Sequence, residues 1–208
     1  MASSRAVQSY VFWAGFTITV WVIFVGGALA FAVLDPAQDL NHVAITITAV
    51  YFVGAWVGAS AVMLIARPDE WRRVSLRVRY ARLMWTLALT AHLAHVLFAF
   101  WLAHGWSHDE AVRHVEEVCG FAEGILVNYL FAAVWLADAV WWWANPTGYA
   151  NRPRWVGWAV HGFLAFVMFN AAVVFASPDM RMSNAMLFAI LAGLLLWRAG
   201  GRQPAAHG

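Results

Sequence analysis

Lysine is absent from this chain of 208 residues, so all 13 of its basic residues are arginines. Charge is scarce as well: 12% of the residues are charged, whereas an average soluble domain has about 25%. Hydrophobic residues make up 63% of the chain, and its mean hydropathy is +0.65. This composition excludes an ordinary soluble domain and predicts an integral membrane protein that contacts the lipid bilayer.

Cysteine occurs once, at Cys119, so the chain forms no internal disulfide. The GxSxG, Walker, CxxC and CxxCH motifs are missing too, which leaves nucleotide hydrolysis, dithiol redox chemistry and c-type haem without support. There is also no HxxHH box of the kind that membrane desaturases use. The net charge of +2 comes from arginines at the ends of apolar stretches, so nucleic acid is not a predicted partner. Whether the protein is an enzyme stays open.

Long apolar stretches are what the sequence does contain. A transmembrane helix needs about 20 mostly apolar residues, and six stretches meet this requirement. They predict an all-α, six-transmembrane-helix bundle that forms a single polytopic membrane domain over residues 1–208, with short amphipathic helices in loops 67–82 and 107–119. The first stretch is predicted to be a retained span, since no small-residue cleavage site follows a short apolar core. The predicted spans are residues 10–34, 43–66, 83–104, 122–144, 155–176 and 184–198.

The arginines also predict an orientation. Placing the N- and C-termini in the cytoplasm leaves only Arg113 and Arg181 on the outer side, as the positive-inside rule requires. The sequence therefore predicts a multi-pass protein of a bacterial inner membrane. Tryptophans near the predicted span ends, among them Trp85 and Trp142, indicate an interfacial aromatic belt.

Ionisable side chains inside the spans are the candidate site. His92 and His95 lie in the third span, Asp138 in the fourth and His161 in the fifth. Intramembrane ionisable residues usually face the bundle interior and mark functional sites. The helical rise of about 1.5 Å per residue places His92, Asp138 and His161 in the same inner half of the membrane.

Neutral imidazole is a common axial ligand of haem iron. We therefore predict one haem b held between the third and fifth spans by His92 and His161, and His95 remains the alternative ligand on the third span. Asp138 is predicted to accept a hydrogen bond from the second ring nitrogen of a ligand histidine. This arrangement broadly resembles small membrane b-type cytochromes, which implies electron transfer with a quinol or a partner subunit.

The histidine spacing departs from one related pattern. Six-span ferric-reductase-like domains carry two well separated histidines on each of two helices, whereas here one span holds a close pair and another holds a single histidine. This difference argues against a two-haem pathway across the bilayer. A chain without any cofactor, acting as a non-catalytic accessory subunit of a larger membrane complex, is the second hypothesis.

An external metal site is the third hypothesis. His104, His108 and Glu123 lie around the predicted outer connection and supply imidazole and carboxylate ligands. Gly105 and a capping box formed by Ser107 and Glu110 interrupt the helix between the two histidines, so helical i,i+4 chelation is not assured.

Overall fold

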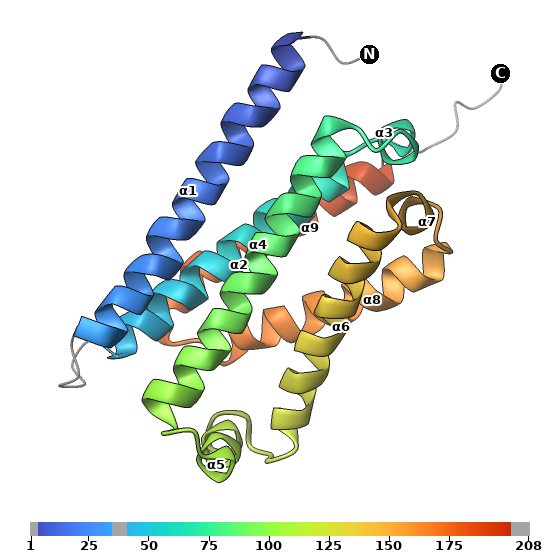
Figure 1. Cartoon of the computed structure of the whole chain (residues 1–208). Coiled ribbons are helices and arrows are strands. Elements are labelled where there is room, and N and C mark those ends of the chain that lie inside the picture. The colour runs from blue at the N-terminus through green and yellow to red at the C-terminus, as the bar shows by residue number, and fades with distance from the viewer. Residues whose placement is uncertain (1–3, 35–40, 201–208) are drawn as a thin grey trace.

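Six helices in the described part of the chain are long and apolar enough to cross a membrane (Figure 1). The computed structural model describes residues 4–34 and 41–200, and the predicted cytoplasmic tail with Arg202 and His207 lies outside these ranges. The prediction of an all-helical protein with six candidate spans is confirmed. The six are α1 (Ser4–Leu34), α2 (Asn41–Ile65), α4 (Leu76–Phe98), α6 (Gly124–Ala144), α8 (Arg154–Phe169) and α9 (Pro178–Gly200).

Two of the spans are extended by π-helical turns. α4 continues into η1 (Ala99–Ala103), and α8 continues into η2 (Asn170–Val174). The last helix is longer than predicted, because it begins at Pro178 and not at residue 184. Proline is favoured at the first turn of a helix, where its missing N–H is not needed, so the segment predicted as a loop is helical.

Short helices occupy the predicted connections. α3 (Pro68–Arg72) lies within 67–82, and α5 (His108–Cys119) fills the predicted amphipathic stretch. A third short helix, α7 (Pro146–Ala150), begins where the Asn145 side chain accepts a hydrogen bond from the Gly148 amide at 2.8 Å. Val74 has a φ of 48° between α3 and α4, and this left-handed residue separates the two helices.

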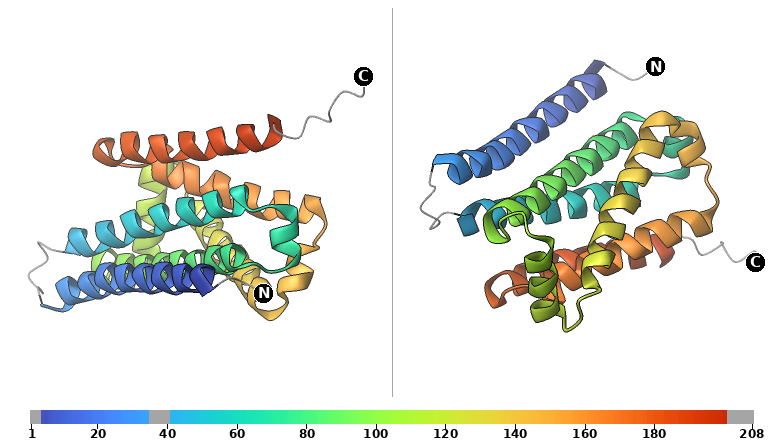
Figure 2. Two further views of the ribbon diagram at one scale, coloured as in Figure 1. Left: turned by 90° about the horizontal axis from the view of Figure 1, so that it is seen from above. Right: turned by 60° about the horizontal axis from the view of Figure 1, so that its bottom comes forward.

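α4 lies in the middle of the bundle, and α1 and α9 lie at its two sides (Figure 2). Buried side chains of α2, α4, α6, α8 and α9 form one core that includes several tryptophans. Of the tryptophans near the predicted span ends, Trp85 and Trp142 belong to this core with exposures of 0% and 1% and so do not face the interface, whereas Trp106, Trp141, Trp143 and Trp155 are exposed. Trp85 donates its indole N–H to Asp138 within the core, whereas the indole nitrogens of Trp56 and Trp135 have no hydrogen-bond partner among the described residues.

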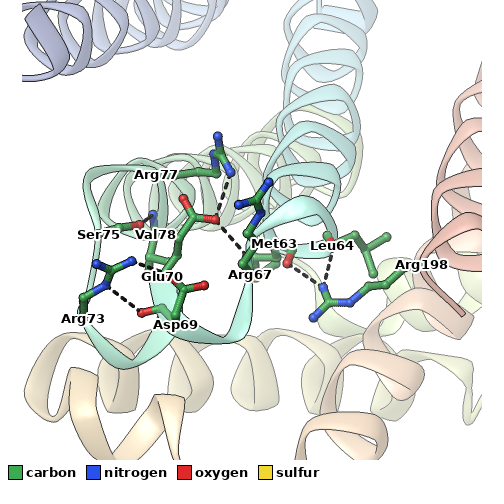
Figure 3. Close-up of polar contacts among 10 residues, drawn as sticks. All are labelled: Met63, Leu64, Arg67, Asp69, Glu70, Arg73, Ser75, Arg77, Val78 and Arg198. Carbon is green, nitrogen blue, oxygen red and sulfur yellow. Dashed lines mark hydrogen bonds and ion pairs between the residues drawn. The ribbon is translucent and has the colours of Figure 1, made fainter. Parts of the chain in front are cut away.

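Arginines gather at one end of the bundle, around α3. Arg77 donates to Glu70 Oε2 at 2.9 Å, and Arg198 of α9 donates to the backbone carbonyls of Met63 and Leu64 (Figure 3). These carbonyls lie in the last turn of α2, where they have no partner within the helix, so Arg198 ties α9 to α2. The first residue of α1 and the last of α9 lie at this same end, which we call the α3 end (Figure 1). The opposite end, where α5 lies, we call the α5 end.

Gly54 and Gly58 form a GxxxG pair in α2. Gly54 faces open space, whereas Gly58 lies against α4. A Cβ added at Gly54 meets no atom within 4 Å, whereas one added at Gly58 comes within 2.7 Å of Met84 Cε. Gly54→Ala should stabilise the protein by up to about 1 kcal/mol, because alanine is the better helix former. Gly58→Leu should destabilise it by about 1 to 3 kcal/mol, because the added carbons press on α4. Thermal unfolding in detergent, followed by circular dichroism, measures both, and shifts of the same sign would contradict the assignment.

Candidate functional site

His92 of α4 is buried at the centre of the bundle without a polar partner. It is 8% exposed, and its ring stacks on Trp135 of α6 with ring centroids 5.7 Å apart. The ring centroids of Phe52 and Phe131 each lie 5.1 Å from the centroid of His92, with interplanar angles of 70° and 86°. Within residues 4–34 and 41–200, neither ring nitrogen of His92 has a hydrogen-bond partner. An unsatisfied polar group in a membrane interior costs several kcal/mol, so this imidazole is available to a ligand.

His95 lies one turn further along α4, and α2 holds its ring. Its Nδ1 is 3.0 Å from the Ile45 carbonyl oxygen and 3.4 Å from Thr48 Oγ1. A carbonyl only accepts hydrogen bonds, so the proton is on Nδ1 and the lone pair is on Nε2. Metal-binding histidines are commonly oriented by a bond of this kind from their other ring nitrogen. His95 is thus also competent as a ligand.

Asp138 and His161 belong to a hydrogen-bonded network near the α3 end. Trp85 Nε1 and Tyr149 Oη each donate to Asp138 Oδ2 at 3.0 Å. Tyr149 Oη is also 3.3 Å from His161 Nε2, and Arg152 Nη2 donates to that same nitrogen at 2.8 Å. Asp138 is 4% exposed, so the carboxylate depends on these donors and not on water. We call these five residues the Asp138 network.

Tyr149 is fixed in this network by its ring contacts. It stacks on Trp142 with centroids 4.6 Å apart and an interplanar angle of 5°, and the Arg152 guanidinium lies 3.6 Å from its centroid. Burial, and after it the neighbouring Asp138, raises the pKa of Tyr149 well above its ordinary value. The phenol therefore keeps its proton and remains a donor to the carboxylate at neutral pH.

The structure does not bring His92 and His161 together. The ring centroids of Trp85 and His161 are 5.3 Å apart, and those of Trp135 and His92 are 5.7 Å apart. The centroids of the two indoles are themselves 5.2 Å apart. Both indoles are 0% exposed and fill the space between the two histidines. Because His161 Nε2 already accepts a bond from Arg152, a haem iron shared by His92 and His161 does not fit this packing. His161 and Asp138 instead both lie beside Tyr149 Oη, which donates its proton to Asp138.

The external residues His104, His108 and Glu123 do not converge either. His108 stacks on Tyr129 with centroids 6.0 Å apart, and its Nδ1 is 3.0 Å from Tyr129 Oη. Glu123 is exposed at the start of α6. His104 instead faces His114 of α5, with ring centroids 5.3 Å apart. Among the described residues, no three His, Cys, Asp or Glu side chains are grouped closely enough to hold a metal ion as they stand.

A tight turn brings His104 against α5. Gly105 and Trp106 both have left-handed backbones, with φ of 52° and 64°, and so reverse the chain. Ser107 then accepts from the Glu110 amide at 3.3 Å, which confirms one half of the predicted capping box, whereas the Glu110 carboxylate pairs with Arg113 and the Ser107 amide donates to the His104 carbonyl. Burial and then the neighbouring His114 lower the pKa of His104, so this imidazole stays neutral over a wider pH range than an ordinary histidine.

No protein family model, curated protein or solved structure matches this chain. The function is therefore inferred from the packing and hydrogen bonding alone.

Sequence reasoning missed the partners of Asp138 and His161. Tyr149 and Arg152 lie in the basic connection between two spans, which the sequence marks only as a loop. The available signal was Asn145-Pro146, an N-cap residue followed by proline, which is typical of a helix start. This short helix carries Tyr149 under the end of α6, where its hydroxyl reaches Asp138.

Proposed function

We propose that the protein is a membrane electron-transfer protein, similar to a b-type cytochrome, in which His92 of α4 ligates the iron of one haem b. The observation that carries the proposal is the buried imidazole of His92, whose two nitrogens have no partner among the described residues. Neutral imidazole is a common axial ligand of haem, and the rings of Phe52, Phe131 and Trp135 make the surroundings of His92 apolar. The electron partner is a quinol or another subunit within the membrane.

The proposal needs one protein ligand. His95 is the alternative on the same helix, because its Nδ1 is held by Ile45 and its Nε2 is the ligating atom. His161 is assigned no contact with iron, since Arg152 binds its Nε2. The α3 end, where Arg77 and its neighbours gather, is proposed to face the cytoplasm of a bacterial inner membrane.

A second candidate function is that of a non-catalytic subunit in a larger membrane complex. The observation that favours it is the Asp138 network, in which the buried carboxylate accepts from Trp85 and Tyr149 and the His161 imidazole accepts from Arg152. Polar networks that are completed within the protein hold a bundle in one arrangement without any chemistry. In this case the protein carries no haem.

The absorption spectrum of the protein, purified in detergent from cells supplied with a haem precursor, separates the two candidates. The haem proposal expects a Soret band and a pyridine haemochrome that corresponds to one haem b per chain. His92→Ala should remove the band, because the ligand is lost, whereas His161→Ala should keep it. Haemin titration of the unloaded protein should give the same ranking.

His108→Ala is the matched control, because it removes an imidazole that stacks on Tyr129 at the α5 end. It should bind haem as the native protein does. A colourless native protein that also shows no saturable haemin binding would overturn the haem proposal in favour of the second candidate. Loss of the band in His95→Ala together with its retention in His92→Ala would overturn the choice of ligand. Size-exclusion profiles establish that each variant is folded.

A further inference from the structure

Two arginines near the start of α4, Arg79 and Arg82, have no carboxylate partner in the part of the chain that the structure describes. Arg79 donates from Nε to the Val74 carbonyl at 3.2 Å. Arg82 donates from Nη1 to the Trp142 carbonyl at 3.3 Å, and its guanidinium lies 3.9 Å from the centre of the Trp143 ring. Carbonyl groups and aromatic rings carry no full negative charge, so both positive charges lack a counter-ion. We call these two residues the α4 arginine pair.

The acidic side chains of the same connection are bonded to other arginines. Asp69 forms an ion pair with Arg73, and Glu70 forms one with Arg77 (Figure 3). A carboxylate that is already paired offers little to a second cation. The counter-ion of the α4 arginine pair therefore has to come from outside the described part of the protein.

The length of the span places the α4 arginine pair at the membrane surface. Leu76–Ala103 is a candidate span of 28 residues. At a rise of about 1.5 Å per residue it is about 42 Å long, which exceeds the hydrocarbon core of about 30 Å by about eight residues. Every arginine of this span lies within residues 76–82. These first turns therefore lie among the lipid headgroups, and Trp143, which is 51% exposed, marks the same level.

We infer that the α4 arginine pair binds the phosphate of one anionic phospholipid in the leaflet at the α3 end. Arg79 and Arg82 are three residues apart, so they share one face of the helix. Both Nη atoms of Arg79 and the Nη2 atom of Arg82 have no hydrogen bond among the described residues. Guanidinium N–H groups match phosphate oxygens in geometry and charge.

The contacts that hold Arg82 prepare it for such a ligand. Its side chain is half-buried between the Trp142 carbonyl and the Trp143 ring. Trp143 is itself fixed, because its Nε1 donates to Thr86 Oγ1 at 2.8 Å. A side chain that is already held in place loses less conformational entropy when it binds a partner. The buried Nε of Arg82 has no acceptor among the described residues, so the guanidinium charge is poorly compensated until an anion is bound.

The same charges select a lipid with a net negative charge. A zwitterionic headgroup adds an ammonium group beside its phosphate, and this cation needs an anionic partner. Asp69 and Glu70 are occupied, so the ammonium group would meet only the positive charges of the α4 arginine pair. Phosphatidylglycerol has the phosphate without the ammonium group, and it is the lipid that we choose as the probe.

Native mass spectrometry of the full chain, purified and delipidated in detergent, tests this inference because it counts bound lipids. We expect one phosphatidylglycerol per chain, bound at least about 10-fold more tightly than phosphatidylcholine. Arg79→Gln and Arg82→Gln should each weaken phosphatidylglycerol binding about 10-fold, because each removes a charged hydrogen-bond donor. Inorganic phosphate at the same concentration should not displace the lipid, since it lacks the acyl chains that stay in the micelle.

Arg77→Gln is the matched control, because it removes the same charge from the same turns of α4 but from an arginine that is paired with Glu70. It should bind phosphatidylglycerol as the native protein does. An equal loss in Arg77→Gln, equal binding of phosphatidylcholine, or displacement by inorganic phosphate would each overturn the inference. Arg79 is exposed, so its replacement leaves the core intact and keeps the test informative if Arg82→Gln fails to fold. The result is independent of the haem proposal, because the lipid count does not depend on haem.

Discussion

Replacing Asp138 by alanine should lower the free energy of unfolding by about 2 to 6 kcal/mol, because two buried donors lose their acceptor at about 1 to 3 kcal/mol each. Trp85 Nε1 and Tyr149 Oη both donate to Asp138 Oδ2, and neither side chain has access to water. Tyr149 Oη lies between Asp138 and His161, and it donates its one proton to Asp138. Loss of the carboxylate therefore removes the bonds that tie α4 and α7 to α6.

Unfolding in mixed micelles, followed by tryptophan fluorescence, measures this effect. Asp138→Asn should cost less than Asp138→Ala, because an amide oxygen has two lone pairs and still accepts both bonds. Asp179→Ala is the matched control: this aspartate is exposed in the first turn of α9, and its removal should cost less than about 1 kcal/mol. Equal stabilities for the native protein and Asp138→Ala would show that the network does not stabilise the bundle.

The six-helix architecture was predictable because it depends on a property that every span carries by itself. Each span must satisfy its own backbone inside lipid, so a run of apolar residues is enough to identify it. Helix ends were less predictable, since they depend on single residues. Pro178 starts α9 six residues earlier than the apolar run indicates, and Val74 ends the short helix before α4.

The candidate site was predictable in its residues but not in its contacts. Depth along a helix placed Asp138 and His161 near each other, and Tyr149 does join them. The same depth argument also paired His161 with His92, and it failed to anticipate the two indoles between them. Depth says nothing of the direction in which a side chain points around its helix, nor of what fills the space between two helices.

One tertiary contact explains why Trp85 was misjudged from the sequence. A tryptophan near a span end is typical of the interface, where its N–H meets water. Trp85 finds an acceptor in Asp138 instead, so its indole is buried without an unsatisfied N–H. A buried carboxylate within reach of an indole is a tertiary contact that no local pattern encodes.

Trp85→Ala should lower the free energy of unfolding by about 3 to 5 kcal/mol, because it removes a large ring from the packed core and leaves a cavity. Trp85 is 0% exposed and contacts Trp56, Trp135 and His161. Trp158 of α8 offers the matched control, since it is 66% exposed and its removal opens no cavity. Trp158→Ala should change the free energy by about 0.5 kcal/mol or less. Unfolding in mixed micelles measures both.

The contribution of the Trp85 hydrogen bond to the free energy of unfolding can be measured separately from that of its ring packing. Trp85→Phe keeps an aromatic ring but removes the N–H, so it should cost about 1 to 3 kcal/mol through the lost bond to Asp138. Combined with Asp138→Ala, it should give less than the sum of the two losses, because both variants remove the same bond. A strictly additive pair would contradict the contact. A shortfall would establish that Trp85 and Asp138 are energetically coupled, as the hydrogen bond between them requires.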